Sequence, residues 1–319
     1  MRGQHEITVR NARVQYKFTV SRNITILRGD SATGKTTLIE MIAAHQRGGE
    51  RSGVEIRSDK PCVVLTEQNW ELMLSAIRDS IVFIDEGADF VRRQEFAHAI
   101  QHTDNYYVIA SRASLFNLPY SVTEIYGIKN TSGNRYQKTK RVYAKFYPLC
   151  NPDKTITGNL DLVIVEDSNA GFTFFAHYFE RLGIRCISAV GNSNILQLLQ
   201  QEEYQTALVI ADGAAFGAYI ENVTALGKAR NVVLYLPESF EWIILKSDAL
   251  NDRDTRLMLE HPAENIESAV HFSWERFFND WLVERSKDTW LQYNKRTLNT
   301  NYLQDAVVEK IQAVFSEQS

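Results

Sequence analysis

The residues whose spacing is most specific for chemistry lie between Gly29 and Thr36, where the sequence fits the pattern G-x-x-x-x-G-K-[ST]. The two glycines let the backbone turn tightly, so that successive N–H groups point at phosphate oxygens. We expect Lys35 to reach the β- and γ-phosphates and the Thr36 hydroxyl to ligate magnesium. The pattern therefore predicts a site for a nucleoside triphosphate, ATP, with Mg²⁺. The residues expected to contact the nucleotide are Gly29, Asp30, Ser31, Ala32, Thr33, Gly34, Lys35, Thr36, Thr37 and Ser111.

Two acidic residues, Asp85 and Glu86, directly follow an apolar run at 81–84. In phosphate-loop proteins, acids at the end of a buried strand form the Walker B motif. Asp85 is expected to hold the magnesium ion together with Thr36, and Glu86 to polarise the attacking water. Lys35 and Glu86 are therefore the expected catalytic residues of hydrolysis. The alternative is a strand end that carries two solvated acids.

A third polar strand end follows the apolar run 106–110, where the next residues are Ser111 and Arg112. Where such a strand lies beside the phosphate-loop strand, a polar residue at its end can sense the γ-phosphate. Ser111 is the candidate for that role, and Arg112 is a candidate positive charge for its own or a neighbouring subunit. An ordinary exit from a strand into a loop is the alternative.

Short apolar strands that alternate with helices position these motifs within residues 1–147. Strands are expected at 23–27, 62–65, 80–84 and 106–110, and helices at 36–45, 70–77 and 90–101. Continuous apolar strands separated by helices predict a parallel sheet covered on both faces. Hairpins are expected at 7–20 and 126–146, and residues 148–158 have the composition of a linker.

A second α/β pattern occupies residues 160–250. Its expected strands are 162–165, 184–189, 207–211 and 232–236, and its expected helices are 170–182, 195–200 and 214–226. Acids end two of the strands, Glu166 after the first and Asp212 after the third. Residues 251–319 are expected to be a helical region, whose aromatic side chains between 273 and 315 are interpreted as a packing surface.

The first region resembles the ATP-binding-cassette-like ATPases, including those of the OLD (overcoming lysogenisation defect) nucleases. The resemblance rests on the hairpin before the loop, the Gly29–Thr36 motif, Asp85 with Glu86, and the strand that ends in Ser111. It implies ATP hydrolysis with magnesium. The chain has no LSGGQ-like signature between the loop and Asp85, so dimerisation of the cassette type around two nucleotides is not expected.

The second region resembles a Toprim domain, the acidic α/β module of topoisomerases, primases and OLD-type nucleases. Glu166 matches the first acid of that family, and Asp212 matches the first acid of its D-x-D pair. The resemblance implies that both are catalytic and bind Mg²⁺ at a phosphodiester. Ala214 stands where the second aspartate belongs, which weakens metal affinity. Glu238 and Glu241 are the candidates for a further ligand.

The two resemblances together suggest an OLD-like protein of phage defence or of a mobile element, in which an ATPase acts with a divergent Toprim-like module on nucleic acid or on a partner protein. The alternative is a nucleotide-gated switch or scaffold whose Toprim-like part is inactive. A small-molecule kinase is a third alternative, but no lid or acceptor site is visible. Basic residues interleaved with aromatic ones at 129–146 suit DNA or RNA, although a solvated hairpin face would look the same.

The bulk composition is that of a globular protein, with 44% hydrophobic residues and a net charge of −4. The three cysteines form no CxxC pair, so neither a zinc site nor a disulfide framework is indicated. The chain opens without an apolar leader and contains no run long enough to span a bilayer. We therefore expect a cytoplasmic homo-oligomer without a membrane segment.

Overall fold

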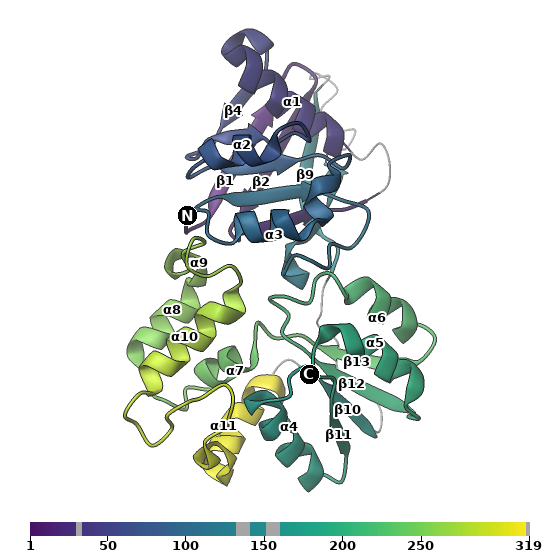
Figure 1. The fold of residues 1–319 in the computed structure, drawn as a ribbon, viewed down its shortest axis with the longest axis vertical. Helices are drawn as coiled ribbons and strands as arrows, with labels where there is room; N and C mark the ends of the chain where they lie inside the picture. The colour runs from purple at the N-terminus through teal and green to yellow at the C-terminus, as the bar shows by residue number, and fades with distance from the viewer. Residues whose placement is uncertain (30–33, 132–140, 151–159, 317–319) are drawn as a thin grey trace. The chain divides into compact units, whose positions relative to one another are not determined.

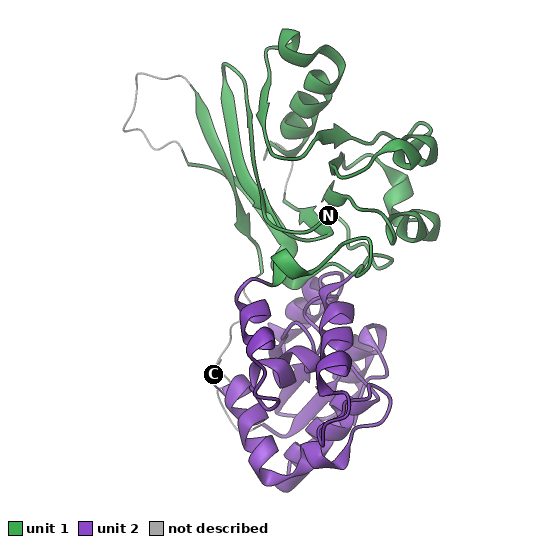
Figure 2. Ribbon diagram, turned by 90° about the vertical axis from the view of Figure 1, so that its left-hand side faces the viewer, with its two compact units in different colours: residues 1–150, 262–272 green, residues 151–261, 273–319 purple. Residues whose placement is uncertain are grey.

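The computed structural model describes residues 1–29, 34–131, 141–150 and 160–316. It confirms an α/β protein and divides the chain into two compact units. Unit 1 comprises Met1–Cys150 together with Pro262–Phe272, and unit 2 comprises Asn151–His261 together with Ser273–Ser319 (Figure 2). Unit 1 contains a large mixed sheet and unit 2 a smaller parallel one. Within the described residues, no helix is both long and apolar enough to cross a membrane.

The sheet of unit 1 has nine strands among the described residues. Figure 1 shows this sheet with helices α1, α2 and α3 around it. Their order across the sheet is β4 (Glu55–Arg57), β1 (His5–Arg10), β2 (Val14–Val20), β9 (Val142–Pro148), β8 (Ile125–Asn130), β3 (Ile24–Leu27), β7 (Tyr106–Ala110), β6 (Ile81–Ile84) and β5 (Cys62–Val64). The expected parallel arrangement holds from β8 through β3, β7 and β6 to β5. The pairs β1–β2, β1–β4 and β8–β9 are antiparallel. The short connection from Arg10 to Val14 explains the antiparallel β1–β2 pair, because a parallel crossover needs a dozen or more residues.

Helix α1 (Lys35–Gly48) packs its apolar side into the core of unit 1. Leu38, Ile39 and Ile42 are buried at helical spacing against Ile7 and Phe18 of the sheet. A short 3₁₀ turn, Gly49–Ser52, follows the helix, and another, Val122–Glu124, precedes β8.

Trp70, which begins helix α2 (Trp70–Ala76), explains why the helix expected at 90–101 is interrupted. The chain forms a 3₁₀ turn at Asp89–Arg92, is extended at Arg93, and then forms α3 (Gln94–Ile100). This break lets Phe90 stack on Trp70 with ring centroids 5.1 Å apart, while Phe96 meets the same ring edge-on at 5.7 Å.

Residues 262–272 belong to unit 1 although they lie far along the chain. This segment contains the short helix α9 (Pro262–Asn265). The N-terminal amine of Met1 donates hydrogen bonds to Glu267 and to Ser268 Oγ, the latter at 2.9 Å. Asn23 Nδ2 donates to the Ser268 carbonyl at 3.3 Å. These bonds attach the segment to the first strands of the chain.

The sheet of unit 2 has the order β11 (Arg185–Ser188), β10 (Leu162–Val165), β12 (Thr206–Ile210) and β13 (Asn231–Tyr235), and all of its pairs are parallel. The central strands β10 and β12 are fully buried. The helices are α4 (Ala170–Arg181), α5 (Asn192–Gln201), α6 (Ile220–Gly227), α7 (Phe240–Lys246), α8 (Arg253–Glu260), α10 (Trp274–Ser286) and α11 (Asp305–Ser316), with a 3₁₀ turn at Thr300–Leu303. Both α10 and α11 contact α7, so the C-terminal helices complete this unit.

Candidate functional site

Strand order in unit 1 brings the three polar strand ends to one edge of the sheet. Strand β7 lies between β3 and β6, and all three are parallel. Leu27 pairs with Ala110, and Ile84 pairs with Ile109, so the strands end almost level. Neighbouring strands are about 4.8 Å apart, which places the end of β6 roughly 10 Å from the end of β3. Gly29, Ser111 and Asp85 therefore leave the same sheet edge.

The start of α1 depends on a close contact between Gly34 and Tyr16. Gly34 has a φ of +96°, in the region that favours glycine, and a Cβ there would lie 2.9 Å from Tyr16 Oη. The Tyr16 hydroxyl donates a hydrogen bond to the Gly34 carbonyl at 3.0 Å. A side chain at position 34 would crowd this hydroxyl and would be strained at this φ, so this position of the chain favours glycine.

Lys35 is buried at the first position of α1, and its Nζ donates a hydrogen bond to the Gly29 carbonyl. Thr36 and Thr37 are exposed in the same first turn. The positive end of the helix dipole and the exposed hydroxyls therefore lie beside a buried ammonium group. The predicted contacts at Asp30, Ser31, Ala32 and Thr33 lie outside the described residues.

Of the two acids after β6, Glu86 contacts a residue that follows β7. Asp85 Oδ1 accepts a hydrogen bond from the Glu86 backbone N–H at 2.9 Å, and Glu86 forms an ion pair with Arg112. Ser111 is buried, and its hydroxyl donates to the Ala113 carbonyl at 2.7 Å. A γ-phosphate sensor would donate that proton to phosphate, so the Ser111 hydroxyl would have to rotate for this role.

The donor set at this edge fits magnesium bound with a nucleotide. Mg²⁺ takes oxygen ligands and commonly uses one or two protein groups together with phosphates and water. The Thr36 hydroxyl is exposed, and the second oxygen of Asp85 is not used by the Glu86 amide. The residues that would hold the ion are therefore Thr36 and Asp85.

Unit 2 contains a pocket of about 240 Å³ that collects acids from distant parts of the chain. Glu166 and Asp212 line it at the ends of β10 and β12, as the parallel sheet requires. Glu241 of α7 also lines the pocket, whereas Glu238 does not. The other charged residues that line it are Asp167, Glu275 of α10 and Lys295, and the sequence patterns did not identify Glu275 or Lys295.

Hydrogen bonds fix Glu166 and its neighbour Asp167 in different ways. Glu166 Oε2 accepts the backbone N–H of Asp212 at 2.9 Å, which ties the ends of β10 and β12 together. Asp167 accepts the N–H groups of Asn169 and Gly171 at 2.9 and 2.8 Å at the start of α4. Asp167 therefore stabilises the N-terminal end of α4, where the helix dipole favours a carboxylate.

Lys295 is the cation of this pocket. Its Nζ lies 2.6 Å from Glu275 Oε1 and 4.0 Å from Glu241 Oε1. The Tyr293 hydroxyl donates to the same Glu241 oxygen at 2.8 Å. Tyr293 and Lys295 come from the segment between α10 and the 3₁₀ turn at 300–303, which no short sequence motif marks.

Burial controls the charge of this pocket. It raises the pKa of Glu166 to about 7 and raises the pKa of Asp212 well above its ordinary value, with further increases from neighbouring carboxylates. Burial also raises the pKa of Glu241, although Lys295 and Tyr293 oppose this. Burial lowers the pKa of Lys295, but Glu241 and Glu275 raise it by more. The lysine thus stays charged, while the deepest acids resist ionisation.

The acids of this pocket are arranged around a lysine. Among the residues that the structure describes, no three His, Cys, Asp or Glu side chains are grouped so that they could hold a metal ion. Ala214, which stands at the expected position of a second aspartate, is itself buried. The cationic side chain that lines the pocket beside these acids is Lys295.

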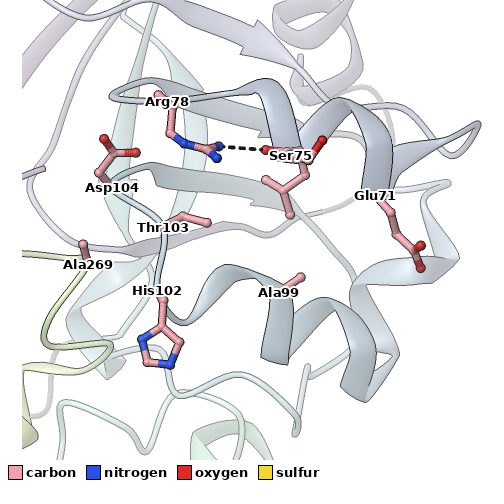
Figure 3. A pocket seen from close by; sticks show the side chains of 9 residues that line it. Glu71, Ser75, Arg78, Ala99, His102, Thr103, Asp104 and Ala269 are labelled. Carbon is pink, nitrogen blue, oxygen red and sulfur yellow. Dashed lines mark hydrogen bonds between the residues drawn. The ribbon is translucent and has the colours of Figure 1, made fainter.

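A separate pocket of about 530 Å³ in unit 1 lies between the C-terminal ends of α2 and α3 (Figure 3). Arg78, His102 and Asp104 line it, and Arg78 donates to the Leu74 carbonyl at 3.4 Å. Asp104 comes just before β7, whereas Ser111 follows that strand. This pocket is therefore at the sheet edge opposite the phosphate-loop motif.

Comparison with known proteins adds no family assignment: no protein-family model matches the chain, and no curated protein matches it.

Proposed function

We propose that unit 1 binds ATP with Mg²⁺ and hydrolyses it. The observation that carries the proposal is the order β3–β7–β6, which supports a common site for Lys35, Ser111 and Asp85. Phosphoryl transfer depends mainly on positioning and on neutralising negative charge, and these residue types supply both.

Each residue has a distinct role in this proposal. Lys35 and the N-terminal turn of α1 bind the phosphates, and Thr36 with Asp85 holds the metal ion. Magnesium would neutralise charge on the phosphates when bound. Glu86 orients the attacking water, and Arg112, its ion-pair partner, holds that carboxylate at the sheet edge.

Two substitutions separate binding from hydrolysis. Lys35→Ala should abolish binding of a fluorescent ATP analogue, because it removes the ammonium group of the first residue of α1, which is proposed to bind the phosphates. Glu86→Gln should keep binding and lower phosphate release by about 10²–10⁴-fold, the usual effect of losing a general base. Normal turnover by Glu86→Gln would show that this acid has been misassigned.

For unit 2, the Lys295–Glu275 ion pair favours a module that does not cleave nucleic acid. In this proposal ATP occupancy of unit 1 gates a partner, and the acids of unit 2 are neutralised internally. A nuclease assay with Mg²⁺ and Mn²⁺ tests it, with Glu166→Ala and Asp212→Ala as variants. We expect no cleavage by the unmodified chain. Cleavage that both substitutions remove would instead support an OLD-like nuclease.

A further inference from the structure

Three lysines lie side by side on neighbouring strands of the unit 1 sheet. Lys17 of β2 pairs in register with Lys145 of β9, and Lys145 pairs with Lys129 of β8. All three side chains are exposed. Residues paired in register project to the same face, and in an antiparallel pair such as Lys145–Lys129 the Cβ atoms lie about 4.5–5.5 Å apart. The lysines therefore form a continuous basic row, and Lys17 joins it only because β2 and β9 are neighbours.

The basic row faces away from the core. Along β2, Tyr16 and Phe18 are buried, whereas Lys17 between them is exposed. Along β9, Ala144 is buried and Lys145 is exposed. The buried residues belong to the core in which α1 packs, so the lysines occupy the opposite face of these strands.

The row places like charges side by side. Like charges directly opposite each other in a sheet destabilise the pair. Lys17 has an ion pair with Glu6 at 3.0 Å, but both side chains are more than half exposed and such pairs contribute little. For Lys145, the part of the chain that the structure describes offers no ion pair or hydrogen bond. A polyanion laid across the three strands would relieve this repulsion.

Aromatic rings lie among the cations. Tyr147 covers Gly127, where a Cβ would lie 2.6 Å from the ring, and Lys129 Nζ lies 5.0 Å from the ring centroid. Tyr143 is exposed on the same side of β9 as Lys145, two residues away. Beside Lys17 lies a groove of about 430 Å³ whose lining also includes the acids Glu6 and Asp59, and whose Arg10 and Arg57 both pair with Glu55. The basic row therefore ends at Lys17.

We propose that the basic row, with Tyr143 and Tyr147, binds single-stranded nucleic acid. The lysines contact the phosphates and the exposed ring of Tyr143 stacks on a base, while the half-buried ring of Tyr147 holds Lys129 beside it. Sheet surfaces bind single strands without sequence preference in this way. A duplex keeps its bases stacked internally and offers no base face to the tyrosines. The proposal deepens the nucleic-acid role suggested for the chain, but it does not depend on ATP binding at the phosphate loop.

The test is fluorescence anisotropy of a labelled oligothymidylate with the full chain. The triple variant Lys17→Gln, Lys129→Gln and Lys145→Gln should bind at least tenfold more weakly. If each lysine neutralises one phosphate, the slope of log K against log [salt] should fall by about 3 × 0.7, or about 2. The matched control is Lys228→Gln, Lys287→Gln and Lys310→Gln, which changes the net charge equally at three exposed lysines of unit 2. This control should retain the affinity and the slope.

Three further measurements decide the interpretation. The thermal midpoint of the basic-row variant should equal or exceed that of the unmodified chain, because repulsion has been removed. Tyr143→Ala should lower the affinity for oligothymidylate more than the affinity for a duplex of the same length. Lys35→Ala should lose ATP binding but keep oligothymidylate binding. This variant therefore distinguishes failure of the present proposal from failure of the ATPase proposal. Equal losses in both triple variants, or binding only to duplex or to phosphatidylserine vesicles, would overturn it.

Discussion

Lys295 Nζ lies 2.6 Å from Glu275 Oε1, in a pocket that also contains Glu166, Asp212 and Glu241. This ion pair joins the segment after α10 to the helix itself and supplies the pocket with its cation. The ammonium group of Lys295 reduces the electrostatic repulsion among these carboxylates, so the acidic cluster does not need a bound metal ion for that purpose.

Removal of that cation should destabilise unit 2. Breaking a buried pair costs about 3–5 kcal/mol, but Lys295 is 40% exposed and solvent screening reduces this to about 1–2 kcal/mol for Lys295→Met. Urea denaturation measures the change. Lys287→Met, at an exposed site, should change the free energy of unfolding by at most about 0.5 kcal/mol. Equal stability of the two variants would show that the ion pair is not needed.

The stability of unit 2 should fall as the pH rises towards neutrality. Burial raises the pKa of Glu166 from 4.5 to about 7, so the folded state binds a proton that the unfolded state releases. The contribution is complete below pH 4.5 and is lost as the pH passes through about 7. It amounts to at most about 3 kcal/mol.

Urea denaturation between about pH 5 and pH 8 measures this slope. In a Trp70→Phe background, all remaining tryptophans belong to unit 2, so their emission reports that unit. Glu166→Gln should reduce the slope, because glutamine does not titrate. Stability that rises over this interval would contradict the assigned environment of Glu166.

Gly34→Ala should weaken ATP binding and destabilise unit 1. The new Cβ meets Tyr16 Oη, and alanine at a φ of +96° costs about 1–3 kcal/mol. Gly53→Ala is the matched control, because Gly53 also has a positive φ but no atom lies within 4 Å of the position that its new Cβ would take. The control should lose some stability and keep ATP affinity. Similar ATP affinities in the two variants would show that Gly34 is not part of the nucleotide site.

Local sequence patterns predicted the positions of the strands along the chain, but not the order of the strands in the sheet. The apolar runs at 81–84, 106–110 and 162–165 became strands, because continuous apolar residues suit a sheet buried on both faces. Their order could not be read from the sequence, since the place of β7 between β3 and β6 results from tertiary packing. The return of residues 262–272 to unit 1 likewise depends on contacts with Met1 and Asn23.

The helix expected at 214–226 begins only at Ile220. The N–H groups of Gly213 and Ala214 bond to the carbonyls of Pro237 and Glu238, which hold this stretch against the end of β13. A Cβ at Gly213 would lie 2.4 Å from the Leu236 carbonyl oxygen, so the close approach is specific to glycine. This long-range contact prevails over local helix propensity. The placement of Lys295 beside Glu275 is likewise a tertiary contact that no local pattern predicts.

Calorimetric titration of Mg²⁺–ATP into the full chain tests most directly whether unit 1 is a nucleotide site. We expect saturable binding by the unmodified chain and by Lys60→Ala, whose lysine instead pairs with Asp79. Lys35→Ala should lose at least about 100-fold in affinity, or about 2.7 kcal/mol. Absence of binding by the unmodified chain, or equal binding by Lys35→Ala, would contradict the proposed function.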